Sequence, residues 1–193
     1  SHMYKRVIAT AGVALVLFAL SIGSAAAQSP YIAVFFETDG WGNYYTMQKD
    51  TPLGGGLDQF YVVAMDLNAL VMAFEYSITI PGSITYATEI PTGIINRGAS
   101  PWFMGGISIA YNLPQNGFKS LLLSTVYFTW NAGDCVVTDD PIVVTHNPTT
   151  GFFGYTLWPS FQKYPISGMT SLLCATIATE ETTWGKVKSL YSE

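Results

Sequence analysis

The chain has 193 residues, of which 49% are apolar, 15% aromatic and only 11% charged, and its formal net charge is −5. Soluble domains carry charge on about 25% of their residues, so apolar material dominates here. This balance excludes intrinsic disorder, which goes with few apolar residues and much charge. Apart from Lys5 and Arg6, the six basic residues are scattered along an acidic chain, which excludes a nucleic-acid-binding surface.

The N-terminus is predicted to be a secretory signal peptide over residues 4–27. Lys5 and Arg6 form its basic start, Val7–Ile22 is an almost unbroken apolar run, and Ala25–Ala27 supplies the small residues of a cleavage site. The apolar run is nearly long enough to cross a bilayer, so an uncleaved membrane anchor is the alternative. Either form predicts a protein that is secreted or held at the cell surface.

The remaining chain is predicted to hold one domain, because about 166 residues suit a single substantial core. The C-terminal stretch around Trp184–Tyr191 is basic with apolar residues at intervals. It is either a frayed or docked end or a sorting or attachment signal. The predicted parts are a cloning scar at 1–3, the signal peptide at 4–27, a β-sandwich domain at 28–178, and a linker with a short tail at 179–193.

The domain is predicted to be all-β, because short apolar and β-branched runs alternate with turn residues every 8–12 positions. This spacing indicates a single sandwich of about 8–9 strands, of the jelly-roll or cohesin-like type or the immunoglobulin-like type. The clearest runs are Tyr31–Phe36, Phe60–Asp66, Phe74–Ile80, Ile84–Ala87, Gly106–Tyr111, Ser120–Trp130, Cys135–Thr138, Ile142–Thr145 and Leu172–Thr176.

Two stretches are predicted to be irregular, at 37–57 and 147–169. The first is long for a connection within a compact domain, and such loops are often functional. The second is rich in aromatic residues, so it is expected to pack over a sheet end or to form the last hairpins. Exposed aromatic rings are a surface on which flat sugar faces stack, although large aromatics more often fill a core. The candidate ligand-binding residues are Trp41, Tyr44, Tyr45 and Trp102.

A calcium site is a second hypothesis for the first irregular stretch. Glu37, Asp39 and Asn43 place oxygen atoms at nearby positions beside flexible glycines, as a hard cation requires. The stretch lacks the complete Asp-x-Asp-x-Asp-Gly order. No zinc-binding spacing and no phosphate-binding glycine loop is present, so no other cofactor is predicted.

The two cysteines, Cys135 and Cys174, both follow the leader, where export permits a disulfide. A bridge between them closes a loop of about 40 residues and contributes about 4 kcal/mol in the chain-entropy model. The alternative is two separate buried thiols, which pack as small hydrophobic groups.

Catalytic groups are sparse. His146 is the one histidine after the leader, and its position where a strand meets a turn favours a structural or capping role over a catalytic one. Asp139 and Asp140 precede a proline and are more simply explained as a turn than as paired catalytic carboxylates. The sequence therefore predicts a protein that is not an enzyme.

The run Phe60–Asp66, followed by Ala69 and then by Ala73–Ile78, resembles secreted bacterial β-sandwich modules of the cohesin-like and immunoglobulin-like kind. In cohesin-like modules a strand likewise leads through a short loop into an apolar-aromatic strand. The chain is also similar to exported bacterial proteins with a leader, one such domain and a short Trp-Gly-x-x-Lys tail, here Trp184–Lys188. The resemblance extends over residues 31–177 and implies a fold and an extracellular role.

Three functions stay open. The leading hypothesis is a non-catalytic, secreted or cell-surface sandwich that acts in extracellular binding or assembly, with a protein, a glycan or a second copy of itself as partner. The alternatives are a carbohydrate-binding module that uses exposed aromatics and a structural subunit of an extracellular filament or sheath. No nucleic acid is expected, and a membrane only through an uncleaved leader. The low charge fits either a polar uncharged surface or one that packs against neighbours.

Overall fold

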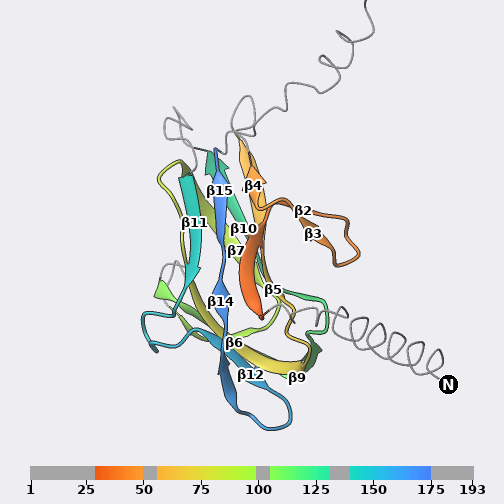
Figure 1. The fold of residues 1–193 in the computed structure, drawn as a ribbon. Coiled ribbons are helices and arrows are strands. Elements are labelled where there is room, and N and C mark those ends of the chain that lie inside the picture. The colour runs from red at the N-terminus through yellow and green to blue at the C-terminus, as the bar shows by residue number, and fades with distance from the viewer. Residues whose placement is uncertain (1–28, 50–55, 99–104, 131–139, 175–193) are drawn as a thin grey trace, which may run out of the picture.

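The computed structural model describes residues 29–49, 56–98, 105–130 and 140–174. The leader, Trp102, Cys135 and the C-terminal tail lie outside the described residues. The described chain consists of strands in two facing sheets, which confirms the predicted all-β sandwich (Figure 1). Among these residues, no helix has the length and apolar character needed to cross a membrane.

The first sheet has five strands and contains the start of the domain. β5 lies between β1 and β10, and both of these pairs are antiparallel. The last member, β14, runs parallel to β1. The order across the sheet is β14 (Ser167–Gly168), β1 (Tyr31–Phe35), β5 (Leu57–Met65), β10 (Ser120–Trp130) and β7 (Ile84–Pro91).

The second sheet is built around β6 (Leu70–Thr79), which pairs with three strands. Its partners are β9 (Ile107–Asn116), β11 (Asp140–Thr145) and β12 (Gly154–Leu157). The sheet is extended by β8 (Ile94–Gly98) beside β9, β13 (Lys163–Pro165) beside β12, and β15 (Thr170–Leu173) and β4 (Gln48–Lys49) beyond β11. A separate pair consists of β2 (Glu37–Thr38) and β3 (Tyr44–Tyr45).

The core lies between the two sheets and is made of alternating residues from both, as half-buried strands require. It includes large side chains that are fully buried, and Trp130 is 7% exposed at its margin. Aromatic rings contact one another there; the Phe60 and Phe128 centroids are 5.7 Å apart, and those of Phe128 and Trp130 are 5.5 Å apart. These ring contacts stabilise the sandwich.

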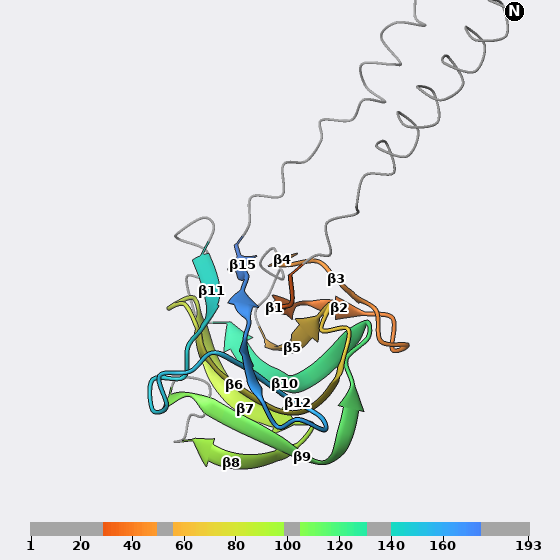
Figure 2. The same cartoon turned by 60° about the horizontal axis from the view of Figure 1, so that its bottom comes forward.

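The strand register brings several turns to one end of the sandwich, which we call the N-terminal end. Tyr31, the first residue of β1, pairs with Met65, the last residue of β5. Leu70 at the start of β6 pairs with Asn116, and Leu157 pairs with the neighbouring Val71. The turns at 66–69, 117–119 and 158–162 therefore lie at this end, whereas Leu173 pairs with Asp140 toward the opposite end (Figure 2).

The two stretches predicted to be irregular contain short strands. Residues 37–49 hold β2, β3 and β4, and residues 147–169 hold β12, β13 and β14, so the expectation of last hairpins is confirmed. β10 has the predicted bounds, whereas β6, β7 and β9 extend beyond theirs. Along most of β10, buried residues alternate with partly buried ones, so only one of its two faces is fully buried.

Candidate ligand-binding site

The segment 36–49 covers the outer face of the first sheet and forms a small second core there. Ala33, Phe35 and Val63 are buried beneath it, and partly buried residues surround them. The ring of Tyr44 supplies much of the cover, with its centroid 6.1 Å from that of Phe35 and 5.7 Å from that of Tyr61. A stretch that the sequence presents as a loop is thus packed onto the sheet.

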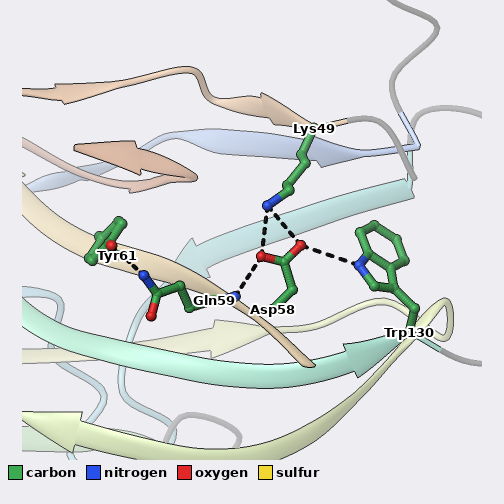
Figure 3. A network of polar contacts seen from close by, with 5 residues as sticks. All are labelled: Lys49, Asp58, Gln59, Tyr61 and Trp130. Carbon is green, nitrogen blue, oxygen red and sulfur yellow. Dashed lines mark hydrogen bonds and ion pairs between the residues drawn. The ribbon is translucent and has the colours of Figure 1, made fainter. Parts of the chain in front are cut away.

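A polar network fixes the far end of this segment (Figure 3). The ammonium of Lys49 on β4 lies 2.7 Å from the carboxylate of Asp58 on β5. The indole Nε1 of Trp130 on β10 donates to the same carboxylate at 3.3 Å, and the backbone N–H of Gln59 donates to it at 2.8 Å. Lys49 is the last residue of the covering segment, and its ion pair with Asp58 fixes that end to β5. The segment is therefore held both at its end and by the packing of Tyr44.

Asp39 organises the turn between β2 and β3. Its carboxylate accepts hydrogen bonds from the backbone N–H groups of Trp41 at 2.7 Å and Asn43 at 3.2 Å, from the Asn43 side-chain amide at 2.6 Å and from the Tyr45 hydroxyl at 3.1 Å. These donors, the Asn43 side chain above all, hold the pKa of Asp39 below its ordinary value. Gly40 and Gly42 have positive φ angles of 77° and 93°, which glycine adopts without strain.

The calcium prediction falls on this same turn. Each donor around Asp39 presents a hydrogen to the carboxylate, so the turn already uses the oxygens that a cation needs. Glu37 is exposed on β2. Within the described part of the chain, no three side chains of the His, Cys, Asp or Glu types gather into a metal-binding group. The geometry assigns Asp39 to the turn, and calcium binding stays an untested prediction.

A shallow hollow of about 350 Å³ lies between this turn and the N-terminal end of the sandwich. The Ser120 hydroxyl donates to the Gly42 carbonyl, which joins the β2–β3 turn to the start of β10. Across the hollow, Asp66 N–H donates to the Lys119 carbonyl at 3.1 Å, which holds two turns together. The lining residues are Gly42, Asn43, Tyr44, Tyr45, Met65, Asp66, Phe118, Lys119 and Ser120.

The four predicted aromatic residues have different places. Trp41 is 91% exposed on the turn, and Tyr45 lines the hollow with 47% of its side chain exposed. Tyr44 also borders the hollow, but its ring packs on the sheet. Trp102 lies outside the described residues. Sequence reasoning missed Phe118, which also lines the hollow and is 55% exposed. The signal that could have found it is an aromatic residue directly after Gly117, in a turn between two strands.

The other predicted site residues lie elsewhere. Cys174 follows β15, is 4% exposed and is not a free cysteine. Its predicted partner Cys135 is outside the described residues, so the pairing stays a prediction. His146 is exposed, with Nδ1 3.2 Å from the hydroxyl of Thr145. The next residue, Asn147, is 1% exposed and its side-chain amide donates to the Ile107 carbonyl at 3.2 Å, so Asn147 holds this turn in place.

No family model and no curated protein matches the sequence. Among solved structures, the chain is similar to CaCohA2 from Clostridium acetobutylicum, with 14% identity over 79% of this chain and 94% of that chain and a TM-score of 0.47. It is also similar to the third ScaB cohesin of R. flavefaciens, solved with a group 1 dockerin, with 12% identity over 74% of this chain and 92% of that chain and a TM-score of 0.47.

A third similar structure is the seventh ScaB type I cohesin from Pseudobacteroides cellulosolvens, with 8% identity over 80% of this chain and 97% of that chain and a TM-score of 0.42. These similar structures include cohesins, the family that the sequence was found to resemble. At these identities the likeness concerns the fold alone.

Proposed function

We propose that the chain is a non-catalytic binding module that works outside the cytoplasm, and that its ligand contacts the hollow beside the β2–β3 turn. The observation that carries this proposal is the position of Trp41, which is 91% exposed on a turn tied together by four hydrogen bonds to Asp39. An exposed tryptophan on an ordered turn is a common feature of binding surfaces, where aromatic residues supply most of the affinity.

Preorganisation supports the same proposal. The segment 36–49 is anchored by the packing of Tyr44 and by the Lys49–Asp58 ion pair. Little conformational entropy is then lost when a ligand binds, so the contact energy of Trp41 and Tyr45 goes into affinity. The predicted signal peptide at 4–27 supports a location outside the cytoplasm.

A glycan is the ligand that the lining favours, because both aromatic and polar side chains line the hollow. Tyr45 and Phe118 offer ring surfaces, while Asn43, Asp66 and Lys119 offer hydrogen-bonding groups. Sugars present the same combination of apolar faces and hydroxyl edges. The carbohydrate-binding alternative therefore stands beside binding to a protein partner.

Affinity electrophoresis on a panel of soluble polysaccharides tests the site. Retardation by one of them is expected, and Trp41→Ala should weaken it about tenfold, as loss of an anchor residue does. Leu57→Ala is the control, because Leu57 is 68% exposed on the first sheet but remote from the hollow. Equal retardation of all three proteins would contradict a glycan site at the turn.

The role of Asp39 is tested by a matched pair of acidic-residue variants. Asp39→Ala removes the acceptor of four hydrogen bonds and should disorder the turn, so that binding falls as it does for Trp41→Ala. Glu37→Gln removes a charge two residues away and should leave binding unchanged. Hydrolysis of glycan, ester or peptide substrates at ordinary enzymatic rates would refute the non-catalytic proposal itself.

A further inference from the structure

The second sheet contains a wide bulge near the N-terminal end of the sandwich. Along β6 the pairing with β9 advances by two residues, from Val71 to Ala73, while along β9 it runs back by five, from Gln115 to Ala110. The extra residues of β9 have no partners across the ladder and bend the strand. Leu113, which lies within this bulge, is 72% exposed.

An apolar groove of about 430 Å³ lies between the bulge and the start of β8. Its lining includes Leu113, the ring of Tyr111 and Ile94, which is 53% exposed. Gly93 allows the turn before β8 to approach β9 closely, because a Cβ at this position would lie 2.5 Å from the Cγ2 atom of Ile109. The groove is therefore bounded by closely packed backbone.

The turn between β12 and β13 carries a projection made of two aromatic rings. Trp158 is 41% exposed and Phe161 is 59% exposed, and their ring centroids are 5.3 Å apart. Trp158 N–H donates to the Leu70 carbonyl at 2.9 Å, and Phe161 N–H donates to the Leu157 carbonyl at 2.9 Å. These bonds hold the two rings, which we call the aromatic turn, against the start of β6.

The groove and the aromatic turn lie on opposite sides of β6 at the same level of the sheet. Val71 pairs with Gln115 toward the groove and with Leu157 toward the aromatic turn. In Figure 1 the end of β9 and the hairpin after β12 form the lower part of the molecule. The exposed apolar side chains across this end of the sheet form what we call the apolar band: Ile94, Leu113, Leu70, Trp158 and Phe161.

The apolar band is uncharged, although the chain has a net charge of −5. The stretches that form it, residues 69–74, 90–96, 107–118 and 157–162, contain no acidic or basic side chain. Two copies of this acidic chain repel each other elsewhere, so the band is where they can meet at the lowest electrostatic cost.

The area of the band suits an interface between two proteins. Weighted by their exposed fractions, its five side chains present on the order of 500 Å² of apolar surface. A standard interface buries about 800 Å² on each partner, of which a little over half is apolar. The band therefore supplies the apolar part of such an interface.

We propose that two copies of the chain dimerise through the apolar band about a two-fold axis, with the aromatic turn of each copy seated in the groove of the other. A two-fold interface requires a self-complementary surface, and the band has a projection at one end and a groove at the other. Aromatic side chains seated in pockets carry much of the binding energy of such interfaces. The band shares no residue with the lining of the hollow, so this surface is additional to the proposed ligand site.

Sedimentation velocity of the full chain at concentrations from about 1 to about 100 µM tests the dimer. A monomer–dimer equilibrium is expected for the natural chain. Leu113→Glu alters the groove and Phe161→Lys alters the aromatic turn. Because the two-fold axis brings each substitution into the interface twice, each variant should weaken dimerisation by at least about a hundredfold. Leu57→Glu is the control, because Leu57 is 68% exposed but lies on the first sheet.

An equimolar mixture of Leu113→Glu and Phe161→Lys tests the two-fold arrangement. In the mixed dimer one contact is natural, and at the other the introduced carboxylate meets the introduced ammonium. The mixture should therefore dimerise where neither variant does so alone. All the substituted side chains are exposed, so the thermal unfolding midpoints should be retained.

Three outcomes would overturn the proposal. A natural chain that is monomeric over the whole concentration range would leave the band to a partner of different chemistry. Association that persists in both single variants would assign the contact to another part of the chain. Folded variants that lose association separately but do not regain it when mixed would exclude the two-fold contact between groove and aromatic turn.

Discussion

Glu89 on the edge strand β7 points its carboxyl group into the sandwich. The residue is 4% exposed, and neither carboxyl oxygen has a hydrogen-bond partner among the described residues. Burial raises the pKa of Glu89, and the nearby Ser124 hydroxyl offsets part of that rise. The Tyr76 hydroxyl, 3.3 Å from that of Ser124, is buried beside it, and burial together with Glu89 raises the pKa of Tyr76. An inward charge on an edge strand also discourages pairing with another sheet.

Stability is predicted to fall as pH rises, because the folded state of Glu89 holds its proton more tightly than the unfolded state. The loss begins near the ordinary pKa of 4.5 and is complete once the pH exceeds the raised folded value. Glu89→Gln cannot ionise, so it should flatten this dependence and gain on the order of 1 kcal/mol at neutral pH. Urea unfolding across pH checks this, and a wild-type curve without that decline would refute it.

Tyr44 and Tyr45 show what sequence reasoning could achieve for single residues. Both were candidate ligand contacts, because an irregular stretch gives no rule for which side chain faces the protein. In the structure they form β3, where successive side chains point to opposite faces. Tyr44 consequently packs on the sheet and Tyr45 reaches the hollow. The sequence showed that both residues are aromatic. Which of them stabilises the sheet and which lines the hollow could be told only from the strand that they form.

At the scale of elements, the covering segment 36–49 makes a separable contribution to stability. Tyr44→Ala removes ring contacts with Phe35 and Tyr61 and should lower the free energy of unfolding by about 2 kcal/mol. Trp41→Ala, on the same segment, should change it by less than about 0.5 kcal/mol because the ring is exposed. Chemical denaturation measures both, and equal losses would show that the segment does not depend on Tyr44.

The passage from β14 to β15 requires a residue without a side chain. A Cβ at Gly168 would lie 2.0 Å from the Val144 carbonyl oxygen, so the backbones must separate to admit it. Gly168→Ala should lower the free energy of unfolding by about 1–3 kcal/mol. Gly82→Ala is the control, because no atom lies within 4 Å of its added Cβ. If Gly168→Ala and Gly82→Ala had the same melting temperature, this close approach would be contradicted.

Long strands were predictable and short ones were not. β10 was predicted with its observed bounds, because eleven residues rich in β-branched and aromatic types carry a clear local signal. β12, β13 and β14 have four, three and two residues between glycines and prolines. The pairing of β12 with β6 and of β14 with β1, both distant in the sequence, fixes these two as strands, and β13 pairs with β12. Such contacts leave no local periodicity.

For the whole molecule, the predicted Cys135–Cys174 bridge gives a clear test. Its reduction, or the pair Cys135→Ser and Cys174→Ser, should lower the free energy of unfolding by about 4 kcal/mol. Intact mass before and after reduction, measured on protein from the native host, shows whether two hydrogens are gained. A chain already carrying both thiols would refute the bridge. The same mass shows whether the predicted signal peptide at 4–27 has been removed.

The two-layer architecture followed from strand spacing and turn residues, because these are local properties summed along the chain. The order of strands did not follow, since pairings such as that of β1 with β14 join residues more than 130 positions apart. The hollow was missed for a similar reason. Its walls come from the β2–β3 turn, the end of β5 and the turn before β10, which only the folded chain brings together.

The parallel pairing of β1 and β14 determines how the domain bears tension. Its first strand begins at the N-terminal end and its last strand, β15, runs out toward the opposite end. A pull between these two points acts along the strands, so the bonds from Ser167 N–H to Pro30, from Met169 N–H to Ile32 and from the Ser171 hydroxyl to Val34 are loaded together. Bonds sheared in parallel fail at a higher force than bonds opened one after another. A pull between the two ends of the sandwich would therefore meet these bonds in shear.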